Sequence, residues 1–282
     1  MFTKLSITFV ILLQSIEGYP SVPGHKPYDI NNILSPRIVG GQDAPEGYAK
    51  HMAALVVGNQ VTMLTCGASI INRRHMLTAA HCIQPYVIWG ELSPHFKGVI
   101  GSNYWNSTNI IKFSGHKIHP KYGWTNLAND IGVLRTAVEI VYSDLVSAIA
   151  MKYDFVGGGV KGFVTGWGQL KVHGHTPYRL QLLYLKTISP LQCVLGVRLA
   201  SSLMGWGYNP VDPSLEICTI HFKGHGMCYG DSGSALVEAE TGKQIGIVSW
   251  GFPCALGAPD MFVRVSAYED FLKDALEEHI EH

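Results

Sequence analysis

The chain has 282 residues, of which 47% are hydrophobic and 15% are charged. Its 21 basic and 21 acidic residues give a formal net charge of zero. This balance argues against the strongly basic surface that binds nucleic acid or anionic membranes, so we expect neither as a partner.

The first 37 residues differ in composition from the rest. Residues 1–18 contain Lys4 and then the apolar run 5–13. This run is too short to span a membrane and is typical of a signal peptide, so we expect cleavage near Gly18 and secretion to the extracellular space. Residues 19–37 are rich in proline and polar residues and show no helix or strand pattern, which indicates a flexible activation propeptide.

Short apolar runs separated by glycine, proline and asparagine predict a mostly β protein without a visible internal repeat. The expected strands span residues 53–57, 76–79, 86–89, 131–134, 162–165, 244–250 and 261–265. At the end of the chain, residues 268–282 predict a helix. Apolar residues recur there at helical spacing, namely Phe271, Leu272, Ala275, Leu276 and Ile280.

The six cysteines are typical of a protein that folds in an oxidising compartment. The sequence alone does not choose among their many possible pairings. Asn106-Ser107-Thr108 is the only acceptable N-glycosylation sequon, and it is either a modified asparagine or an unused surface turn.

The most informative motif runs from Gly226 to Ser234 and reads Gly-Met-Cys-Tyr-Gly-Asp-Ser-Gly-Ser. It places Ser232 in a glycine-flanked turn, directly after Asp231. Such a turn exposes a hydroxyl and leaves backbone N–H groups free to face a substrate oxygen, as a catalytic nucleophile requires. A Gly-Asp-Ser-Gly sequence by itself is weak evidence, since turns are rich in these residues.

Two residues far upstream supply the partners that a nucleophilic serine needs. His81 follows an apolar, strand-like run, and it is either packed in the core or a general base, because imidazole exchanges protons near neutral pH. Asp130 precedes the expected strand 131–134, where an aspartate is either a turn residue or the acid that orients the imidazole. The order histidine, aspartate, serine is that of the chymotrypsin architecture.

With these motifs together, the chain from Ile38 to about Phe271 resembles the chymotrypsin-like serine proteases. Supporting sequences are Arg-Ile-Val-Gly-Gly at 37–41, Cys-Gly-Ala-Ser at 66–69, His-Pro at 119–120, Thr-Gly-Trp-Gly at 165–168 and Ser-Trp-Gly at 249–251. The resemblance implies an all-β fold of two six-stranded antiparallel β-barrels packed together with a C-terminal α-helix. The first barrel would occupy residues 38–150, and the second barrel and the helix residues 151–282.

The resemblance also implies an activity and the residues that perform it. The protein would be a monomeric serine endopeptidase that cleaves polypeptides through an acyl-enzyme and needs no cofactor. His81, Asp130 and Ser232 would form the catalytic triad, and the N–H groups of Gly230 and Ser232 the oxyanion hole. The implied disulfides are Cys66–Cys82, Cys193–Cys218 and Cys228–Cys254.

A latent form is implied by the resemblance of Arg37-Ile38 to the activation site of the family. A trypsin-like protease would cut after Arg37, and the new amine of Ile38 would pair with Asp231. A buried acid beside Ser232 is costly without a cation, so this pairing would stabilise the oxyanion turn. In the alternative interpretation, Arg37 is an ordinary linker residue. Protein protease inhibitors are further candidate partners.

The substrate pocket implied by the resemblance combines features of two specificities. Ser249, Trp250 and Gly251 would bind the substrate backbone as an added strand. Gly226 stands at the base, where trypsins carry an aspartate, and Asp260 stands on the opposite wall. This combination is similar to crustacean collagenolytic and some insect chymotrypsin-like proteases, and it predicts cleavage after Phe, Tyr or Leu, and possible cleavage after Arg or Lys. In the alternative, Asp260 lies in a surface turn after a proline.

The chain departs from the family pattern in two places, and two alternative functions stand beside the main one. Most relatives have glycine where this chain has Ser234, which bears on the oxyanion turn. The loop after His81 offers only Glu91 as a calcium ligand, so we expect no metal. The alternatives to an active, broad protease are a catalytically silent homologue that acts by binding, and a narrow-specificity protease of a cascade.

Overall fold

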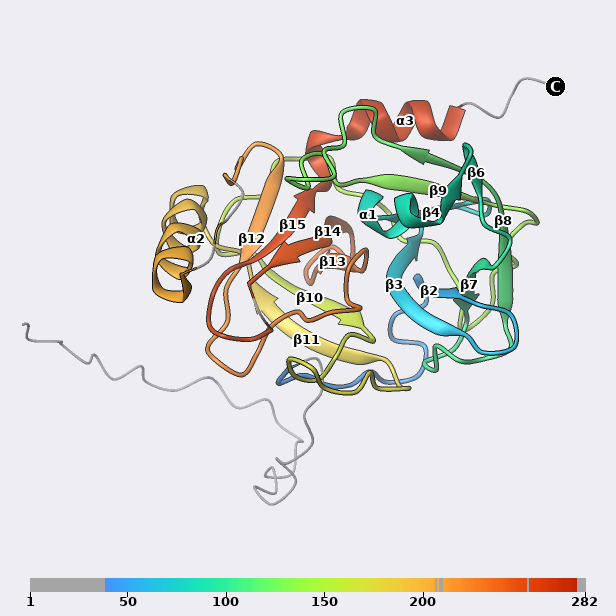
Figure 1. Cartoon of the computed structure of the whole chain (residues 1–282), viewed down its shortest axis with the longest axis horizontal. Coiled ribbons are helices and arrows are strands. Elements are labelled where there is room, and N and C mark those ends of the chain that lie inside the picture. The colour runs from blue at the N-terminus through green and yellow to red at the C-terminus, as the bar shows by residue number, and fades with distance from the viewer. Residues whose placement is uncertain (1–38, 206, 208–209, 253, 278–282) are drawn as a thin grey trace, which may run out of the picture. The chain divides into compact units, whose positions relative to one another are not determined.

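The computed structural model describes residues 39–205, 207, 210–252 and 254–277. The expected signal peptide and propeptide, together with Arg37 and Ile38, lie outside the described residues. Two β-structures lie side by side, the first built from the N-terminal half of the chain and the second from the C-terminal half (Figure 1). No helix among the described residues has the length and apolar character needed to cross a membrane.

The first β-structure is a closed barrel of six antiparallel strands, as predicted. Its strands follow the order β2-β3-β4-β9-β8-β7 around the barrel. Closure leaves no unpaired strand edge. Fully buried side chains such as Leu55, Met76 and Leu134 fill the interior. In chain order the strands are β2 (Met52–Val57), β3 (Met63–Ile70), β4 (His75–Thr78), β7 (Phe96–Ile100), β8 (Ile110–Ile118) and β9 (Gly132–Thr136).

The second β-structure is an antiparallel sheet of seven strands in the order β1-β11-β10-β13-β14-β15-β12. A single bridge from Thr187 to Thr219 joins its last strand, β12, back to the end of β11. The N–H of Ile188 still bonds the carbonyl of Cys218, and the pairing ends after it because Ser189 and Pro190 begin a helix and Pro190 has no N–H to donate. The strands are β1 (Gln42–Asp43), β10 (Lys161–Gly166), β11 (Gln181–Lys186), β12 (Glu216–Thr219), β13 (Ala235–Glu238), β14 (Gln244–Gly251) and β15 (Asp260–Arg264).

The second predicted barrel is therefore confirmed with two differences. Six of its strands curl round until one bridge closes them, and β1 adds a seventh strand beside β11. The strand β1 precedes the first barrel in the chain, so it ties the start of the described chain to the second sheet.

The segment after β4 differs most from its prediction. A strand is expected at 86–89, but only Val87 and Ile88 form one, β5 (Val87–Ile88), which pairs with β6 (Glu91–Leu92). Gln84–Tyr86 instead form a 3₁₀ turn that follows the one-turn helix α1 (Ala80–Ile83). Trp89 and Gly90 both have positive φ, which matches the tight turn of a two-residue β-hairpin.

Two longer helices flank the sheets. The C-terminal helix α3 (Glu269–Glu277) confirms the predicted helix, and it buries Phe271, Leu272 and Ala275 against the core of the first barrel. The last residues of that prediction, 278–282, lie outside the described chain. The second helix, α2 (Pro190–Met204), lies at the outer side of the second sheet and is not predicted from the sequence (Figure 1).

Candidate active site

His81 and Asp130 meet because of the register of two paired strands. β4 and β9 are antiparallel, with Thr78 opposite Gly132. The chain that continues beyond this pair carries His81 and Asp130 to the same end of the first barrel. Asn129 has φ 52, a left-handed conformation that asparagine tolerates, and it turns the chain immediately before Asp130.

The carboxylate of Asp130 is fully buried and accepts three hydrogen bonds. Its Oδ1 accepts the backbone N–H of His81 at 2.8 Å. Its Oδ2 lies 2.7 Å from Nδ1 of His81 and accepts a bond from Ser249 Oγ at 2.6 Å. These donors compensate a buried negative charge. They also fix the imidazole with Nδ1 toward the acid, which leaves Nε2 for another partner.

Ser232 lies in a turn that packs directly on the first barrel. Its carbonyl oxygen accepts the N–H of Gly67 at 2.7 Å. Gly230 has φ 99 and Gly233 has φ 80, conformations that favour glycine. A Cβ on Gly233 would overlap Thr78 Oγ1 and the carbonyl oxygen of Gly67, so this close approach also requires glycine.

His81 and Ser232 both line a cavity of about 280 Å³. Within the described chain no hydrogen bond joins Ser232 Oγ to His81, so the structure brings the two side chains to one cavity without joining them. Such bonds are often long in unliganded active sites and shorten when the substrate binds.

Asp231, next to Ser232 in the chain, is fully buried and packs against the Thr-Gly-Trp-Gly sequence at 165–168. Its carboxylate accepts the N–H of Gly168 at 2.8 Å and that of Cys228 at 3.0 Å. Burial raises the pKa of Asp231 to about 7, and no cation of the described chain pairs with it. A Cβ on Gly166 or Gly168 would overlap this carboxylate, which explains the two glycines of the motif.

Asp260 lines the same cavity as Ser232 and begins strand β15. It is 8% exposed, so the alternative that placed it in a surface turn is wrong. Its Oδ2 accepts the N–H of Met227 at 3.2 Å, and a Cβ on Gly226 would lie 3.0 Å from the same oxygen. Burial raises the pKa of Asp260 to about 7.

The end of β14 carries three of the predicted site residues. The pairing of β14 with β15 shifts register between Val248 and Trp250, so Ser249 forms an irregularity in the ladder. Such irregularities re-aim side chains. Ser249 reaches Asp130 of the first barrel, whereas Trp250 and Gly251 stay with the second sheet and line the cavity.

Some residues of the site are not predicted from the sequence. The cavity is also lined by Val248 and Phe252, and by Met227 and Tyr229, whose place inside the serine motif is a signal that could have identified them. Ser234, the departure from the family pattern, is fully buried, and Gly67 makes room for it because a Cβ on Gly67 would overlap Ser234 Oγ.

The three implied disulfides are all present, namely Cys66–Cys82, Cys193–Cys218 and Cys228–Cys254. The first fixes the turn that holds His81, and the last joins the serine segment to the chain after β14. Of the described residues, Cys66, His81 and Cys82 alone place three candidate metal ligands close together, but disulfide sulfurs are not thiolate ligands. Asn106 lies in an exposed turn, as a glycosylated asparagine must.

This fold and the grouping of His81, Asp130 and Ser232 define the class of serine proteases. A sequence profile of the family described as Trypsin matches residues 38–272, and the chain therefore belongs to the trypsin family. It is a serine endopeptidase, and its substrates are polypeptides.

The similar proteins carry both trypsin and chymotrypsin names. The chain is 34% identical over 238 residues to chymotrypsin-2 of Vespa crabro, covering 84% of this chain and 98% of that protein. It is 31% identical over 252 residues to trypsin alpha-4 of Lucilia cuprina, covering 83% and 92% of the two chains. It is also 31% identical over 233 residues to trypsin alpha of Drosophila melanogaster, covering 76% and 84%.

Proposed function

We propose that this endopeptidase is secreted as a zymogen and, once cut after Arg37, cleaves after large hydrophobic residues and also after basic ones. The observation that carries the proposal is one cavity that Ser232, His81 and Asp260 all line. The nucleophile, its base and the residue that would select the side chain of the substrate therefore face the same bound peptide.

In the proposed mechanism Ser232 Oγ attacks the carbonyl carbon of the scissile bond, and its proton passes to Nε2 of His81. Asp130 stabilises the resulting imidazolium through the 2.7 Å contact at Nδ1. The N–H groups of Gly230 and Ser232 stabilise the oxyanion. His81 then gives the proton to the leaving amine, and water hydrolyses the acyl ester with His81 as its base.

The latent state is supported by the burial of Asp231. An acid with a pKa raised to about 7 and no cation from the described chain is stabilised when a positive group reaches it. The amine of Ile38, freed by a trypsin-like protease, is the proposed partner. Secretion is supported by the apolar run 5–13 and by three disulfides, and protein inhibitors that insert into the same cavity are expected partners.

The specificity is supported by the position of Asp260 beside Gly226. Gly226 adds no side chain beside Asp260, which leaves room for Phe, Tyr and Leu. With a carboxylate on the wall, the same cavity attracts Arg or Lys when Asp260 is ionised. The matching of this chain to relatives named both chymotrypsin and trypsin is compatible with such a mixed preference.

A fluorophosphonate probe, which labels activated serines, tests the proposal. We expect labelling and casein cleavage after treatment with trypsin, little of either before it, and none in Ser232→Ala. Arg37→Gln, which removes the site of the cut, should remain latent after the same treatment. If the trypsin-treated parent is not labelled, the protein is a silent homologue. If it is labelled but cleaves few members of a peptide panel varied at P1, it is a narrow protease of the cascade type.

A further inference from the structure

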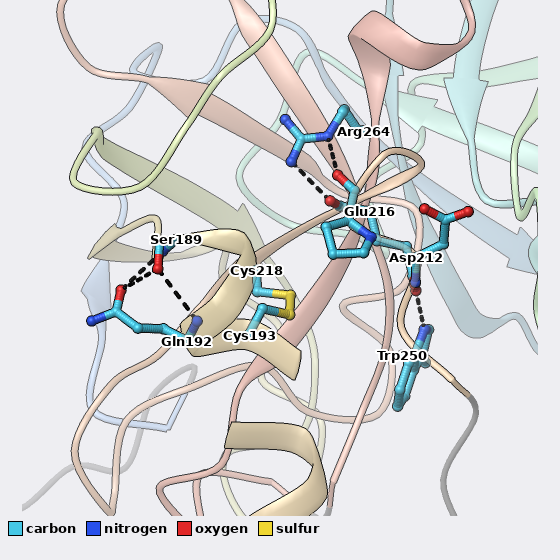
Figure 2. Close-up of a disulfide and its surroundings, with 9 residues drawn as sticks. Ser189, Gln192, Cys193, Asp212, Glu216, Cys218, Trp250 and Arg264 are labelled. Atoms are coloured by element: carbon cyan, nitrogen blue, oxygen red, sulfur yellow. Dashed lines mark hydrogen bonds between the residues drawn. A yellow bond between two sulfur atoms is a disulfide. The ribbon is translucent and has the colours of Figure 1, made fainter. Parts of the chain in front are cut away.

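Trp250 lines the cavity and packs against residues of the second sheet and of α2. Its ring packs against a buried cluster that contains Cys193, Cys218 and Met261. Its indole Nε1–H donates a hydrogen bond to Oε1 of Glu216 at 2.7 Å (Figure 2). The ring is thus fixed by apolar contact and by one polar contact.

Glu216 lies near the disulfide that joins β12 to α2. Glu216 and Cys218 are two residues apart on β12, and alternate residues of a strand share a face. The carboxylate of Glu216 therefore lies on the same face as the Cys193–Cys218 disulfide (Figure 2). A strand that is covalently joined to a helix is a rigid base from which to hold the indole.

Glu216 is itself fixed at both side chain and backbone. Its Oε2 accepts the N–H of Asp212 at 2.9 Å, and its own N–H donates to the carbonyl of Asp212 at 2.8 Å. Its carbonyl accepts a bond from Nη2 of Arg264 at 2.9 Å. Arg264 is 3% exposed and also donates to the carbonyls of Val156 at 2.6 Å and Pro213 at 3.1 Å.

The hydrogen bond from Trp250 reaches a carboxylate that forms no ion pair with another described residue, since the Arg264 guanidinium bonds the backbone carbonyl of Glu216 and not its side chain. Hydrogen bonds to an ionised acceptor are stronger than those between neutral groups. A second cavity of about 70 Å³, which Leu127, Asp130 and Tyr268 also line, borders Glu216. Truncation of Glu216 to alanine would therefore enlarge an existing space and leave the indole N–H without its acceptor.

We propose that Glu216 is a positioning residue that sets how strongly the protease binds extended substrates. By holding the indole of Trp250, it keeps the cavity wall in the orientation that receives the substrate residues preceding the scissile bond. This role rests on the proposed function, in which Ser232 attacks a peptide bound in that cavity. It acts on binding and leaves the chemistry at Ser232 unchanged.

The test compares trypsin-treated variants on a tetrapeptide amide and on a single-residue ester with the same P1 side chain. Glu216→Ala should lower kcat/KM for the tetrapeptide about tenfold through KM, and should leave kcat and the ester reaction at parental values. Trp250→Phe, which keeps the ring apolar but removes the N–H donor, should give a similar loss. Glu216→Gln retains an oxygen acceptor and should recover most of the efficiency. The control Glu139→Gln, at an exposed carboxylate, should behave as the parent.

A double-mutant cycle decides whether the two residues act through one bond. The combined Glu216→Ala and Trp250→Phe protein should lose no more than either single variant, because both remove the same interaction. Independent, additive losses overturn the proposal, as do equal losses on the tetrapeptide and the ester, or a parental KM in Glu216→Ala. Failure of the parent to react with a fluorophosphonate overturns the proposed function instead. Normal labelling with an unchanged KM overturns the positioning role alone.

Discussion

The selectivity of this protease should change with pH through Asp260. The carboxyl is buried beside Gly226, and its pKa is raised from 3.8 to about 7. Below that pKa the group is protonated and neutral, so it offers no charge to a bound Arg or Lys. Above it the group is ionised, and the pocket attracts a basic side chain. Cleavage after basic residues should therefore increase, relative to cleavage after aromatic ones, as the pH rises through 7.

The size of the change follows from a single titration. A group with a pKa of about 7 is about one-tenth ionised near pH 6 and about nine-tenths ionised near pH 8. The ratio of kcat/KM for an Arg substrate to that for a Phe substrate should rise about tenfold over this interval. Because kcat/KM reports the free enzyme, the relevant pKa is that of the unoccupied pocket. Any protonation step that both substrates share cancels in the ratio.

The assay uses two peptide amides that are identical except at P1, with the trypsin-treated enzyme at several pH values. Asp260→Asn is the matched control, because the amide has the shape of the acid and no charge at any pH. Its ratio should be constant and low. Asp231, the neighbouring acid with a raised pKa, acts on both substrates alike. The reasoning is refuted by a constant ratio in the parent enzyme, or by the same rise in Asp260→Asn.

Two predictions concern the packing that supports the site. Gly168→Ala should reduce activity and lower the melting temperature, because the added Cβ overlaps the Asp231 carboxylate; Gly157→Ala, where a Cβ meets open space, is its control, and equal melting temperatures would contradict the packing argument. Replacement of Cys193 and Cys218 by serine opens a loop with a sequence separation of 25 and should lower the free energy of unfolding by about 3.5 kcal/mol. Urea denaturation measures that loss, and an unchanged midpoint would show that the link contributes nothing.

The strands that the sequence predicts best contain a short apolar run. β2, β10, β14 and β15 each lie within one residue of the expected bounds. The helix α2 is not predicted, although its start carries a capping box in which Ser189 and Gln192 bond each other. The reason is its exposed face, where apolar side chains replace the polar ones that mark an amphipathic helix, namely Leu191, Leu195, Leu199 and Leu203.

The candidate site likewise contains residues that the sequence predicts and residues that it does not. His81, Asp130 and Ser232 are each embedded in a local motif; in the structure Asp130 bonds His81, and His81 and Ser232 line one cavity. The bond between Glu216 and Trp250 joins residues 34 positions apart and has no motif. It depends on which face of β12 meets the indole, and this is decided by the register of β12 on β15, which no short stretch of sequence encodes.

Because of the irregularity at Ser249, strand β14 both bonds Asp130 and lines the cavity. Ser249 ties β14 to Asp130, while the adjacent Trp250 and Gly251 line the cavity that we propose binds the substrate. A displacement of this strand consequently moves the recognition surface and the tether of the acid in the same step. Engineering that reshapes substrate choice through β14 should therefore slow turnover as well. Changes confined to flanking side chains such as Phe252 are the better starting point for altering selectivity at constant speed.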